Sequence, residues 1–520
     1  MLRKYPLCSV LILGLLSLAV PASPAVYGLV VGIDAYEHYP PLQGAVNDAR
    51  AIAEALRTAG IQELVLVLDR EATRHKILET WQRFVRQAKP GDTIIFTYAG
   101  HGAQEPEQII GNEQDGKDEV LVLAGFDTRQ HNSERIRDDE IQELFQSAAH
   151  LKIVFIADAC YSGTLTRSAY LPVRTRTIGD YGKIEYDQLP RPKPTAKTRP
   201  EGDLAHVTFF SASREHEVTP EVRIEGRIHG ALSWSFAQAV RGAADQDHDG
   251  ILRKGEAEHF VLENVRMRTE YKQHPQVQPE GGATTPLLAL RSVTPPSLTI
   301  VPSADVILLH ITGTNAPRAT MLYQQMRRIT PVPEKTGADL VWDVQKAEVL
   351  SALGDVVAYP HDNTPHAMQQ IIDKWALLQT VHSLSAQRSL RLRVEPGDDL
   401  HRHGALLKVS LEGQRYPYLT LFNLTADGTV QFLYPVAQQN DPLQVAVDRP
   451  FRLPPIRVTR PFGAEHLVAV VSQTPLQALH RTIQQLHGRP LASQLEAALK
   501  QQVTGVSYQM GVLGLYTAEQ

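Results

Sequence analysis

The sequence predicts an α/β protein with a mostly parallel sheet covered by helices on both faces, followed by a β-rich α+β module. In residues 26–170, short apolar runs alternate with segments of helical spacing. Such strands are typical of a parallel sheet that is buried on both faces. In residues 390–470, short strand patterns are bounded by turn residues instead. The chain has 520 residues, of which 43% are hydrophobic and 21% charged, as expected for a folded protein of several domains.

The elements of the first region follow from its residue patterns. Residues 26–33 read Val-Tyr-Gly-Leu-Val-Val-Gly-Ile, which predicts a buried first strand. Apolar residues then recur at helical spacing over 45–58, and Gly60 ends this helix. The same reasoning predicts strands at 64–68, 93–98, 119–124 and 153–157 and helices at 73–88 and 138–148.

The domain boundaries follow from changes in composition. Residues 26–170 form the first region, and residues 171–203, rich in proline and basic residues, form a linker or loop. Residues 204–292 resume the domain, with a strand at 207–211 and helices at 231–241 and 256–271. Residues 293–520 form the β-rich module, with helical stretches at 366–380 and 475–500.

The first 25 residues have the pattern of a cleaved secretory signal peptide. Basic Arg3 and Lys4 precede a 14-residue apolar run at 7–20, which is shorter than the roughly 20 residues of a membrane-spanning helix. We therefore expect export without a permanent membrane span. Loss of the segment changes the formal net charge from −5 to −7, and an acidic chain of this kind gives no indication of nucleic-acid binding.

The cysteine count draws attention to one residue. The chain has two cysteines, and Cys8 lies in the expected signal peptide, so the mature chain would keep Cys160 alone. Exported proteins tend to pair their cysteines or to lack them. A single remaining thiol is therefore either a small apolar core residue or a reactive group, and its surroundings decide between the two.

Two short motifs indicate that Cys160 is reactive. His101 lies in Tyr-Ala-Gly-His-Gly-Ala-Gln directly after the expected strand at 93–98, and Cys160 lies in Asp-Ala-Cys-Tyr-Ser-Gly directly after the strand at 153–157. Ligands of open parallel sheets bind beyond the carboxyl ends of the strands. A histidine beside a cysteine raises its thiolate fraction and can protonate a leaving amine. The competing interpretation, a core cysteine and a strand-capping histidine, does not explain why both occupy equivalent positions.

These motifs resemble those of the caspase-hemoglobinase fold, in particular metacaspases and bacterial caspase-like proteases. The family carries Ser-Gly-His-Gly after one strand and Asp-x-Cys-x-Ser-Gly about sixty residues later, where this chain has residues 99–102 and 158–163. The similarity covers residues 26 to about 290 and includes Ala-Val-Asn-Asp-Ala at 45–49. Residues from about 293 resemble a module of unknown function that often follows bacterial caspase-like domains.

The resemblance implies an exported cysteine endopeptidase, periplasmic or extracellular in a bacterium, that acts on protein or peptide substrates and is a monomer. Cys160 would be the nucleophile and His101 its partner, with the backbone N–H groups of Gly102 and Cys160 as oxyanion donors. Asp48 and Asp158 match the acidic residues of the pocket that binds the substrate side chain before the cleaved bond. Two carboxylates there would favour Arg or Lys.

Calcium is a further expectation, although the chemistry itself requires no cofactor. Residues 245–256 match an EF-hand loop with Asp245, Asp247, Asp249 and Glu256 at acidic positions and a backbone carbonyl from Ile251. The resemblance to calcium-dependent metacaspases implies a weaker second site. Its residues would be Asp118, Asp138 and Asp139, but Arg167 replaces a fourth acidic residue there.

Two other functions remain open at this point. A catalytically silent scaffold of the same fold could bind calcium or a protein, and an active enzyme could prefer Asp or Asn instead. The linker at 171–203 also offers basic residues at which an Arg- or Lys-specific enzyme could cut itself, against the alternative of a plain loop. These residues are Arg174, Arg176, Lys183, Arg191, Lys193, Lys197 and Arg199.

Overall fold

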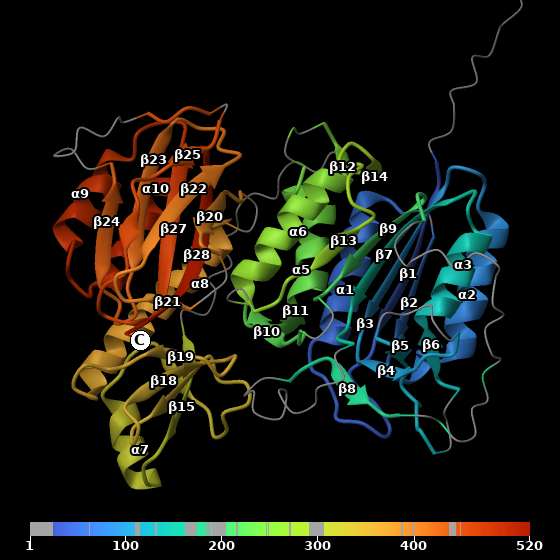
Figure 1. The fold of residues 1–520 in the computed structure, drawn as a ribbon, viewed down its shortest axis with the longest axis horizontal. Coiled ribbons are helices and arrows are strands. Elements are labelled where there is room, and N and C mark those ends of the chain that lie inside the picture. The colour runs from blue at the N-terminus through green and yellow to red at the C-terminus, as the bar shows by residue number, and fades with distance from the viewer. Residues whose placement is uncertain are drawn as a thin grey trace, which may run out of the picture.

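A computed structural model describes residues 24–519 except for several gaps. The gaps are 62, 110–114, 130–132, 162–173, 183, 185–188, 190–203, 215–216, 246, 248, 270–271, 291–305, 386–387, 398–399, 436–443 and 448. The expected signal peptide up to residue 23, Arg167, the boundary near 292 and the basic residues Lys183, Arg191, Lys193, Lys197 and Arg199 therefore lie outside the described residues. Figure 1 shows the remaining chain as an N-terminal α/β part and a C-terminal part rich in strands.

The centre of the N-terminal part is a six-stranded sheet in the order β13-β9-β7-β3-β1-β2. Its five long strands run parallel and β13 pairs antiparallel at one edge, so the expected mostly parallel sheet is confirmed. The strands are β1 (Val26–Gly32), β2 (Glu63–Leu68), β3 (Thr93–Ala99), β7 (Lys152–Asp158), β9 (Val207–Ser211) and β13 (Gln276–Gln278). Each expected strand of this sheet lies within two residues of its predicted position.

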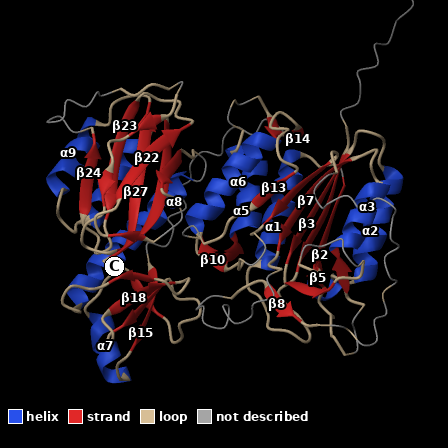
Figure 2. Cartoon of the chain, in the orientation of Figure 1, coloured by secondary structure: helices blue, strands red, loops and turns tan. Residues whose placement is uncertain are grey.

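Helices cover both faces of this sheet, as its apolar strands predict (Figures 1 and 2). On one face, side chains such as Phe96 and Phe155 pack against α2 (Arg74–Gln87) and α3 (Asp138–Ser147). On the other face, side chains such as Val30 and Ile156 pack against α1, α5 and α6. These helices are α1 (Ala45–Ala59), α5 (Ala231–Gln238), which continues into a π-helical turn at Ala239–Ala243, and α6 (Lys254–Arg268).

A second, four-stranded sheet in the order β6-β5-β4-β8 lies beside the carboxyl ends of the central strands. It consists of β4 (Gly102–Pro106), β5 (Lys117–Val122), β6 (Arg135–Arg137) and β8 (Thr177–Asp180). The expected strand at 119–124 therefore belongs to this sheet. The expectation that residues 171–203 are only a loop or linker is wrong at 177–180, because these residues pair with β4.

Short strands complete the N-terminal part. They form the hairpin β10 (Glu221–Ile224) and β11 (Arg227–Gly230), and the pair β12 (Ile251–Arg253) and β14 (Pro286–Ala289). A single turn of 3₁₀ helix spans Asp69–Glu71. The hairpin leads directly into α5 and contacts α1 through β11.

The C-terminal part is β-rich α+β, as the sequence predicts. One five-stranded sheet is β15 (Ile307–Thr312), β16 (Ile329–Pro331), β17 (Leu340–Asp343), β18 (Glu348–Ser351) and β19 (Val356–Ala358). Another is β21 (His401–Arg402), β23 (Tyr418–Leu424), β24 (Val430–Tyr434), β27 (Gly463–Ser472) and β28 (Tyr508–Ala518). The remaining strands are β20 (Arg391–Glu395), β22 (Leu406–Glu412), β25 (Phe451–Arg452) and β26 (Ile456–Arg457), and the helices are α7 (Ala316–Gln324), α8 (Pro365–Ser385), α9 (Gln477–Leu486) and α10 (Ala492–Val503).

Ion pairs join the two parts. The Arg223 guanidinium contacts the Asp339 carboxylate, Lys272 Nζ lies 3.1 Å from Asp355 Oδ1, and Arg391 Nε lies 3.5 Å from Glu263 Oε1. None of the helices in the described ranges has both the length and the apolar character that crossing a membrane requires.

Candidate active site

The register of the central sheet places His101 and Cys160 at equivalent positions. Strands β3 and β7 are parallel neighbours in which Ala99 pairs with Asp158. His101 and Cys160 each follow two residues after this pair, at the same edge of the sheet. The Gly100 N–H donates to the Asp158 carbonyl oxygen at 3.3 Å, which continues the ladder beyond the strand ends. The two motifs of the sequence thus meet at the carboxyl end of adjacent strands.

His101 is held by three neighbours. Its backbone N–H donates to the Tyr36 hydroxyl at 2.7 Å, and its carbonyl accepts from the Tyr98 hydroxyl at 2.7 Å. Its ring lies 4.6 Å from the Tyr36 ring between centroids, and its Nε2 lies 2.8 Å from the Pro40 carbonyl oxygen. Because a carbonyl oxygen only accepts, Nε2 carries the proton and Nδ1 has a free lone pair.

The protonation state of the His101 ring suits a general base. The pKa of His101 is lowered to about 4, mainly by burial and to a smaller extent by the charges of Arg176 and Arg174, against the opposing effect of the hydrogen bond to Pro40. The Nδ1 atom is buried and has no hydrogen-bond partner among the described residues. The ring is therefore neutral near pH 7, with its unprotonated nitrogen available to accept a proton.

Cys160 is buried, and its Sγ donates to the Glu217 carbonyl oxygen at 3.0 Å. The Glu217 side chain is itself bound by His274, whose Nδ1 lies 2.8 Å from Oε1 and whose backbone N–H donates to Oε2 at 3.0 Å. The thiol thus faces the segment before β10.

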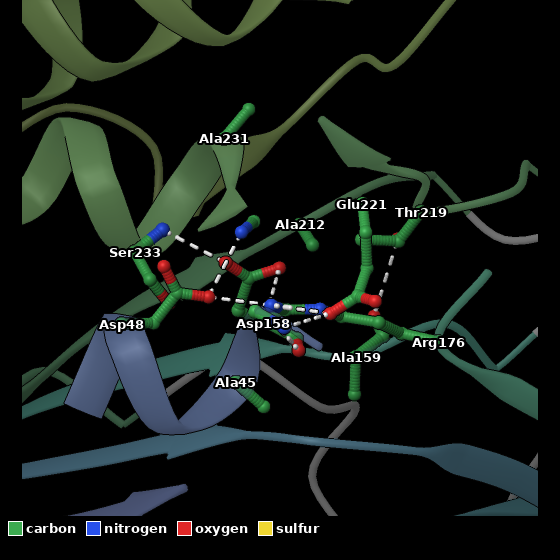
Figure 3. Close-up of polar contacts among 12 residues, drawn as sticks. Ala45, Asp48, Asp158, Ala159, Arg176, Ala212, Thr219, Glu221, Ala231 and Ser233 are labelled. Carbon is green, nitrogen blue, oxygen red and sulfur yellow. Dashed lines mark hydrogen bonds and ion pairs between the residues drawn. The ribbon is translucent and has the colours of Figure 1, made fainter. Parts of the chain in front are cut away.

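Arg176 fills a buried pocket lined by three carboxylates (Figure 3). Its Nη2 lies 2.5 Å from Asp48 Oδ2 and 3.5 Å from Glu221 Oε1, and its Nη1 lies 3.1 Å from Asp158 Oδ1. The side chains of Arg176, Asp48 and Asp158 have no exposed surface. The structure therefore brings the two predicted pocket residues together around an arginine, and adds Glu221 to them.

Backbone N–H groups hold these carboxylates in place. Asp48 Oδ2 accepts from Gly230 N at 2.8 Å, and Asp158 Oδ2 accepts from Ser233 N at 2.8 Å. Gly230 is required there, since a Cβ atom would lie 2.3 Å from Asp158 Oδ2 and 2.4 Å from Arg176 Nη1. The position of each carboxylate is thus fixed by the fold.

Glu221 and Asp48 have further partners. Glu221 accepts from Gln43 N at 2.9 Å and from Gly44 N at 2.7 Å, and Asp48 Oδ1 lies 2.8 Å from His229 Nδ1. The pocket is therefore built from the start of α1, the end of β7, the β10–β11 hairpin and the start of α5.

The pocket carries an excess of negative charge. Burial raises the pKa of Asp158 and of Glu221, and the Arg176 guanidinium opposes this rise in both. Burial alone would lower the pKa of Arg176, but the carboxylates of Asp158, Asp48 and Glu221 raise it above its usual range. A buried guanidinium is thus strongly favoured here, and a carboxylate in its place would be rejected.

The backbone of the same arginine contacts both expected oxyanion donors. The Arg176 carbonyl oxygen accepts from Gly102 N at 2.9 Å and from Cys160 N at 3.0 Å. The Arg176 N–H donates to the Thr219 carbonyl at 3.0 Å, and the Glu221 N–H donates to the Arg174 carbonyl at 2.8 Å. Residues 174–176 therefore lie as an extended strand across the site.

The acidic residues of the EF-hand-like loop come together only in part. The carboxylates of Asp245, Asp247 and Asp249 lie within 4.8 Å of one another. Glu256 instead accepts from the Arg253 N–H at 3.0 Å and so caps α6, and the Ile251 N–H donates to Asp249. The Arg253 guanidinium lies 3.3 Å from Asp247 Oδ2 and 2.5 Å from Asp249 Oδ2, and competes with a cation there.

The second set of acidic residues forms no such group in the part of the chain that is described. Asp118 Oδ2 accepts from Gln108 N at 3.1 Å, and Asp138 accepts from the backbone of Glu119 and of Asp139. Burial, with Asp139 nearby, raises the pKa of Asp118 to about 7. Asp118 and Asp139 thus lie near each other, but the three residues do not bring their ligand atoms together as Asp245, Asp247 and Asp249 do.

Sequence reasoning missed Glu221, Tyr36, Pro40 and Gly230, and it named Arg176 only as one of seven basic residues of the linker. Arg176 and Glu221 lie in segments without regular periodicity, and Tyr36, Pro40 and Gly230 lie in loops or at strand ends. A single basic residue in a linker and a single acidic residue at a strand start are common, so neither provides a signal in one sequence. Only the pairing of residues 174–176 with residues 219–221 brings them together.

Comparisons with known proteins agree with this geometry. Residues 26–281 match the model of the caspase domain, and residues 401–475 match that of a domain of unknown function, DUF4384. Metacaspase-1A of Aspergillus terreus is 25% identical over 294 aligned residues that cover 48% of this chain and 69% of that protein. Metacaspase-1 of Ajellomyces capsulatus is 24% identical over 301 residues, 50% of this chain and 81% of that protein.

The matched stretch covers between 69% and 81% of the length of these two metacaspases. The solved structure of protein GSU0716 from Geobacter sulfurreducens is 20% identical and covers 52% of this chain and 100% of that chain, with a TM-score of 0.37. Residues 26–281 of this chain thus match the caspase domain and are similar to the metacaspases, and a match to DUF4384 follows at residues 401–475.

Proposed function

We propose that this protein is an endopeptidase that hydrolyses peptide bonds after Arg or Lys through Cys160 and His101. One observation carries the proposal. An arginine side chain lies in a pocket of three buried carboxylates while its carbonyl oxygen accepts two backbone N–H groups, one of them from the candidate nucleophile. A substrate arginine needs both of these interactions at once.

In the proposed reaction, His101 takes the proton of the Cys160 thiol, and the thiolate attacks the carbonyl carbon of the substrate. The N–H groups of Gly102 and Cys160 stabilise the developing oxyanion, which is worth roughly 3–4 kcal/mol per donor in known enzymes. His101 then gives its proton to the leaving amine, and water hydrolyses the thioester. The neutral ring with a free Nδ1 supports the role of His101 as the first base.

The pocket argues against the other two functions. An Asp side chain would add a fourth carboxylate beside Asp48, Asp158 and Glu221, and an Asn side chain is too short to replace a guanidinium in ion pairs with all three. A silent scaffold would have no need for two N–H donors that meet beside a cysteine. Both alternatives remain outcomes of the test below.

The test is hydrolysis of fluorogenic peptides that end in Arg, Lys, Asp or Asn. We expect Arg and Lys peptides to be cleaved by the wild type, and Cys160→Ala to lose at least about a thousandfold in kcat/KM. Cleavage of Asp or Asn peptides instead would show a different pocket preference. Silence on every peptide would favour the scaffold.

A matched pair of histidines tests the base. His206 Nε2 also lies within hydrogen-bond distance of a backbone carbonyl, that of Phe145 at 2.9 Å, but it lies at the opposite end of the sheet from the thiol. We expect His101→Gln to lose activity and His206→Gln to retain it. Equal losses in both variants would show that the effect is on folding rather than on proton transfer.

We propose in addition that the loop 245–256 binds calcium weakly and that calcium is not needed for bond cleavage. Three carboxylates within 4.8 Å support binding, and Arg253 beside them supports a low affinity. Calorimetric titration with calcium of the wild type and of Asp245→Asn tests the site. Assays with a chelator test the requirement.

We also propose export to the periplasm or the exterior of a bacterial cell, and a monomeric state. The signal-like residues 1–25 support export. Immunoblotting of cell fractions with N-terminal sequencing checks the first proposal, and light scattering of the purified protein checks the second.

A further inference from the structure

We infer that the C-terminal part holds a binding site for a primary ammonium group on an unbranched alkyl stem, such as the side chain of lysine. The inference is independent of the proposed peptidase function. The site is a cavity of about 40 Å³ between the sheet β21-β28-β27-β23-β24 and the strands β22 and β26. Most of its lining lies in residues 401–475, which match DUF4384, and Leu515 and Thr517 on β28 complete it.

Three neighbouring strands of this sheet change from apolar to polar side chains at the same end. On β23, β27 and β28, a leucine of the sandwich core is followed at the next inward position by a polar residue that lines the cavity. These pairs are Leu421 and Asn423, Leu467 and Glu465, and Leu515 and Thr517. The register pairs Asn423 with Leu467 and Glu465 with Leu515, so the polar residues of the three strands lie diagonally next to one another. The polar end of the core is thus built by the sheet itself.

The hydrogen bonds of this polar group leave acceptors free. Asn423 Nδ2 donates to Glu465 Oε2 at 2.6 Å and to Gln431 Oε1 at 3.0 Å, which fixes the orientation of the amide. Asn423 is 6% exposed, and its Oδ1 has no hydrogen-bond partner among the described residues. Glu465 Oε1 accepts from Thr517 Oγ1 at 3.2 Å. An ionised carboxylate has about four acceptor positions, so Glu465 keeps lone pairs that a ligand donor can use.

The Glu465 carboxylate also has no cation directly beside it. Within the described ranges, no Lys, Arg or His side chain lies within ion-pair distance of its oxygens. Burial raises the pKa of Glu465, and the hydrogen bond from Asn423 and the charge of Lys374 oppose this rise. Lys374 Nζ itself donates to the Ala464 carbonyl oxygen at 2.5 Å. Because a partly buried carboxylate without an adjacent cation is costly, a ligand that brings a positive charge and N–H donors would offset this cost.

The walls and the volume restrict the kind of cation. The wall across from the polar group is mainly apolar and can pack against methylene groups. Its apolar residues are Leu407, Val409, Ile456 and Val458. The volume of about 40 Å³ corresponds to about three water-sized spheres, which suits an ammonium with one or two methylenes. A planar guanidinium or a tetramethylammonium ion is larger. Arg457 at the rim is exposed, and its Nη1 donates to the Gly404 carbonyl oxygen at 3.1 Å.

A different explanation is that Glu465 is a structural residue that balances the buried charge of Lys374. Glu465→Gln separates the explanations, because Gln can still accept from Asn423 Nδ2 while the charge is lost. If the carboxylate serves a ligand, the unfolding midpoint should stay unchanged or rise. A structural role predicts a lower midpoint. Glu412→Gln is the matched control, since Glu412 on β22 pairs with Arg393 Nε at 3.1 Å and does not line the cavity.

The experiment titrates the full chain with n-butylamine by isothermal titration calorimetry. All samples carry Cys160→Ala, so that no hydrolysis contributes heat. We expect saturable binding, a loss of affinity of about tenfold or more in Glu465→Gln, and unchanged affinity in Glu412→Gln. We expect no binding of n-butanol, which lacks the charge, or of tetramethylammonium, which is too large.

A titration with N-acetyl-lysine amide distinguishes the two sources of this chemistry. Affinity at least equal to that of n-butylamine would show that a lysine side chain enters the site. Binding of n-butylamine alone would assign the site to free alkylamines.

Several results would overturn the inference. They are the absence of saturable n-butylamine binding, and equal affinities before and after Glu465→Gln, which would place the amine elsewhere, for example in the acidic pocket of the N-terminal part. Binding of n-butanol or tetramethylammonium as tight as that of n-butylamine would overturn the ligand class. A lower unfolding midpoint in Glu465→Gln without a change in amine affinity would identify Glu465 as a structural residue. Peptide hydrolysis is not measured in these titrations, so the proposed peptidase function stands or fails separately.

Discussion

The N-terminal part contains two buried ion clusters, and they differ in the charge of the group at the centre. In the first, one carboxylate, Glu105 on β4, accepts from Arg135 Nε at 2.8 Å, from Arg137 Nε, and from the Tyr181 hydroxyl at 2.6 Å. In the second, one guanidinium, Arg176 directly before β8, meets three carboxylates. Both clusters are almost completely buried, yet only the second adjoins a thiol and a histidine.

The difference lies in what holds each cluster together. The Glu105 carboxylate receives its hydrogen bonds from side chains, so each member of that cluster depends on the others. The pocket carboxylates receive theirs from backbone N–H groups of residues 43, 44, 230 and 233, and so keep their places without the arginine. A buried charge is weak evidence of function by itself. A buried charge whose partners are fixed independently forms a pocket for an exchangeable cation.

The largest expected effect in this comparison is that of Asp158→Asn on the hydrolysis of Arg peptides. Asn can still accept the hydrogen bond from Ser233 N, but the substitution removes one of the negative charges that face the guanidinium. We expect kcat/KM for Arg peptides to fall about a hundredfold or more, as for other buried charge pairs that lose one partner. Peptide hydrolysis with the free energy of unfolding measured in parallel checks this. Equal loss on a peptide with a neutral residue at that position would contradict a role in recognition.

The counterpart is Glu105→Gln, which leaves Arg135 and Arg137 without their carboxylate. We expect the free energy of unfolding of the caspase domain to fall by about 3–5 kcal/mol. We also expect kcat/KM for Arg peptides to stay within about threefold of the wild type. A threefold change corresponds to less than about 1 kcal/mol of activation free energy. Urea unfolding followed by tryptophan fluorescence measures the first quantity. A selective loss of Arg cleavage in this variant would erase the distinction between the clusters.

Glu221→Gln should have a smaller effect than Asp158→Asn. The Glu221 Oε1 atom lies 3.5 Å from Arg176 Nη2, farther than the oxygens of Asp48 and Asp158, and burial already raises its pKa. We expect a loss of about tenfold in kcat/KM for Arg peptides, the weakest of the three carboxylate variants. Kinetics of Asp48→Asn, Asp158→Asn and Glu221→Gln on one Arg peptide rank them, and a larger loss in Glu221→Gln would contradict this order.

The smallest effect concerns pH. Burial lowers the pKa of His101 to about 4, so the ring stays neutral and able to accept a proton as pH falls to about 5. We therefore expect the acid limb of kcat/KM for Arg peptides to lie below the ordinary histidine pKa of about 6.5. The pH dependence of peptide hydrolysis by the wild type measures this limb. An acid limb at about pH 6.5 or above would show that the ring is hydrated when it accepts the proton.

Much of this picture could be predicted from the sequence, because it depends on local patterns. The strand at 93–98 and the strand at 153–157 are apolar runs, and their last residues lead directly into the His101 and Cys160 motifs. The β-rich character of the C-terminal module was predicted correctly from turn residues and alternation. The short strand at 177–180 was not, because its four residues pair only with β4 and carry no periodic pattern of their own.

The sequence by itself predicted a candidate nucleophile, a candidate base and two acidic pocket residues, since each belongs to a motif tied to the end of a strand or the start of a helix. Only the tertiary structure decided that Asp48 and Asp158, 110 positions apart, share one guanidinium, and that Glu221 joins them. It also placed Asp245, Asp247 and Asp249 within 4.8 Å of one another, but gave Asp118, Asp138 and Asp139 no such compact arrangement. The physical reason is that strand and helix patterns are local. A buried charge cluster depends on which distant segments the fold brings together, and one sequence carries no record of that pairing.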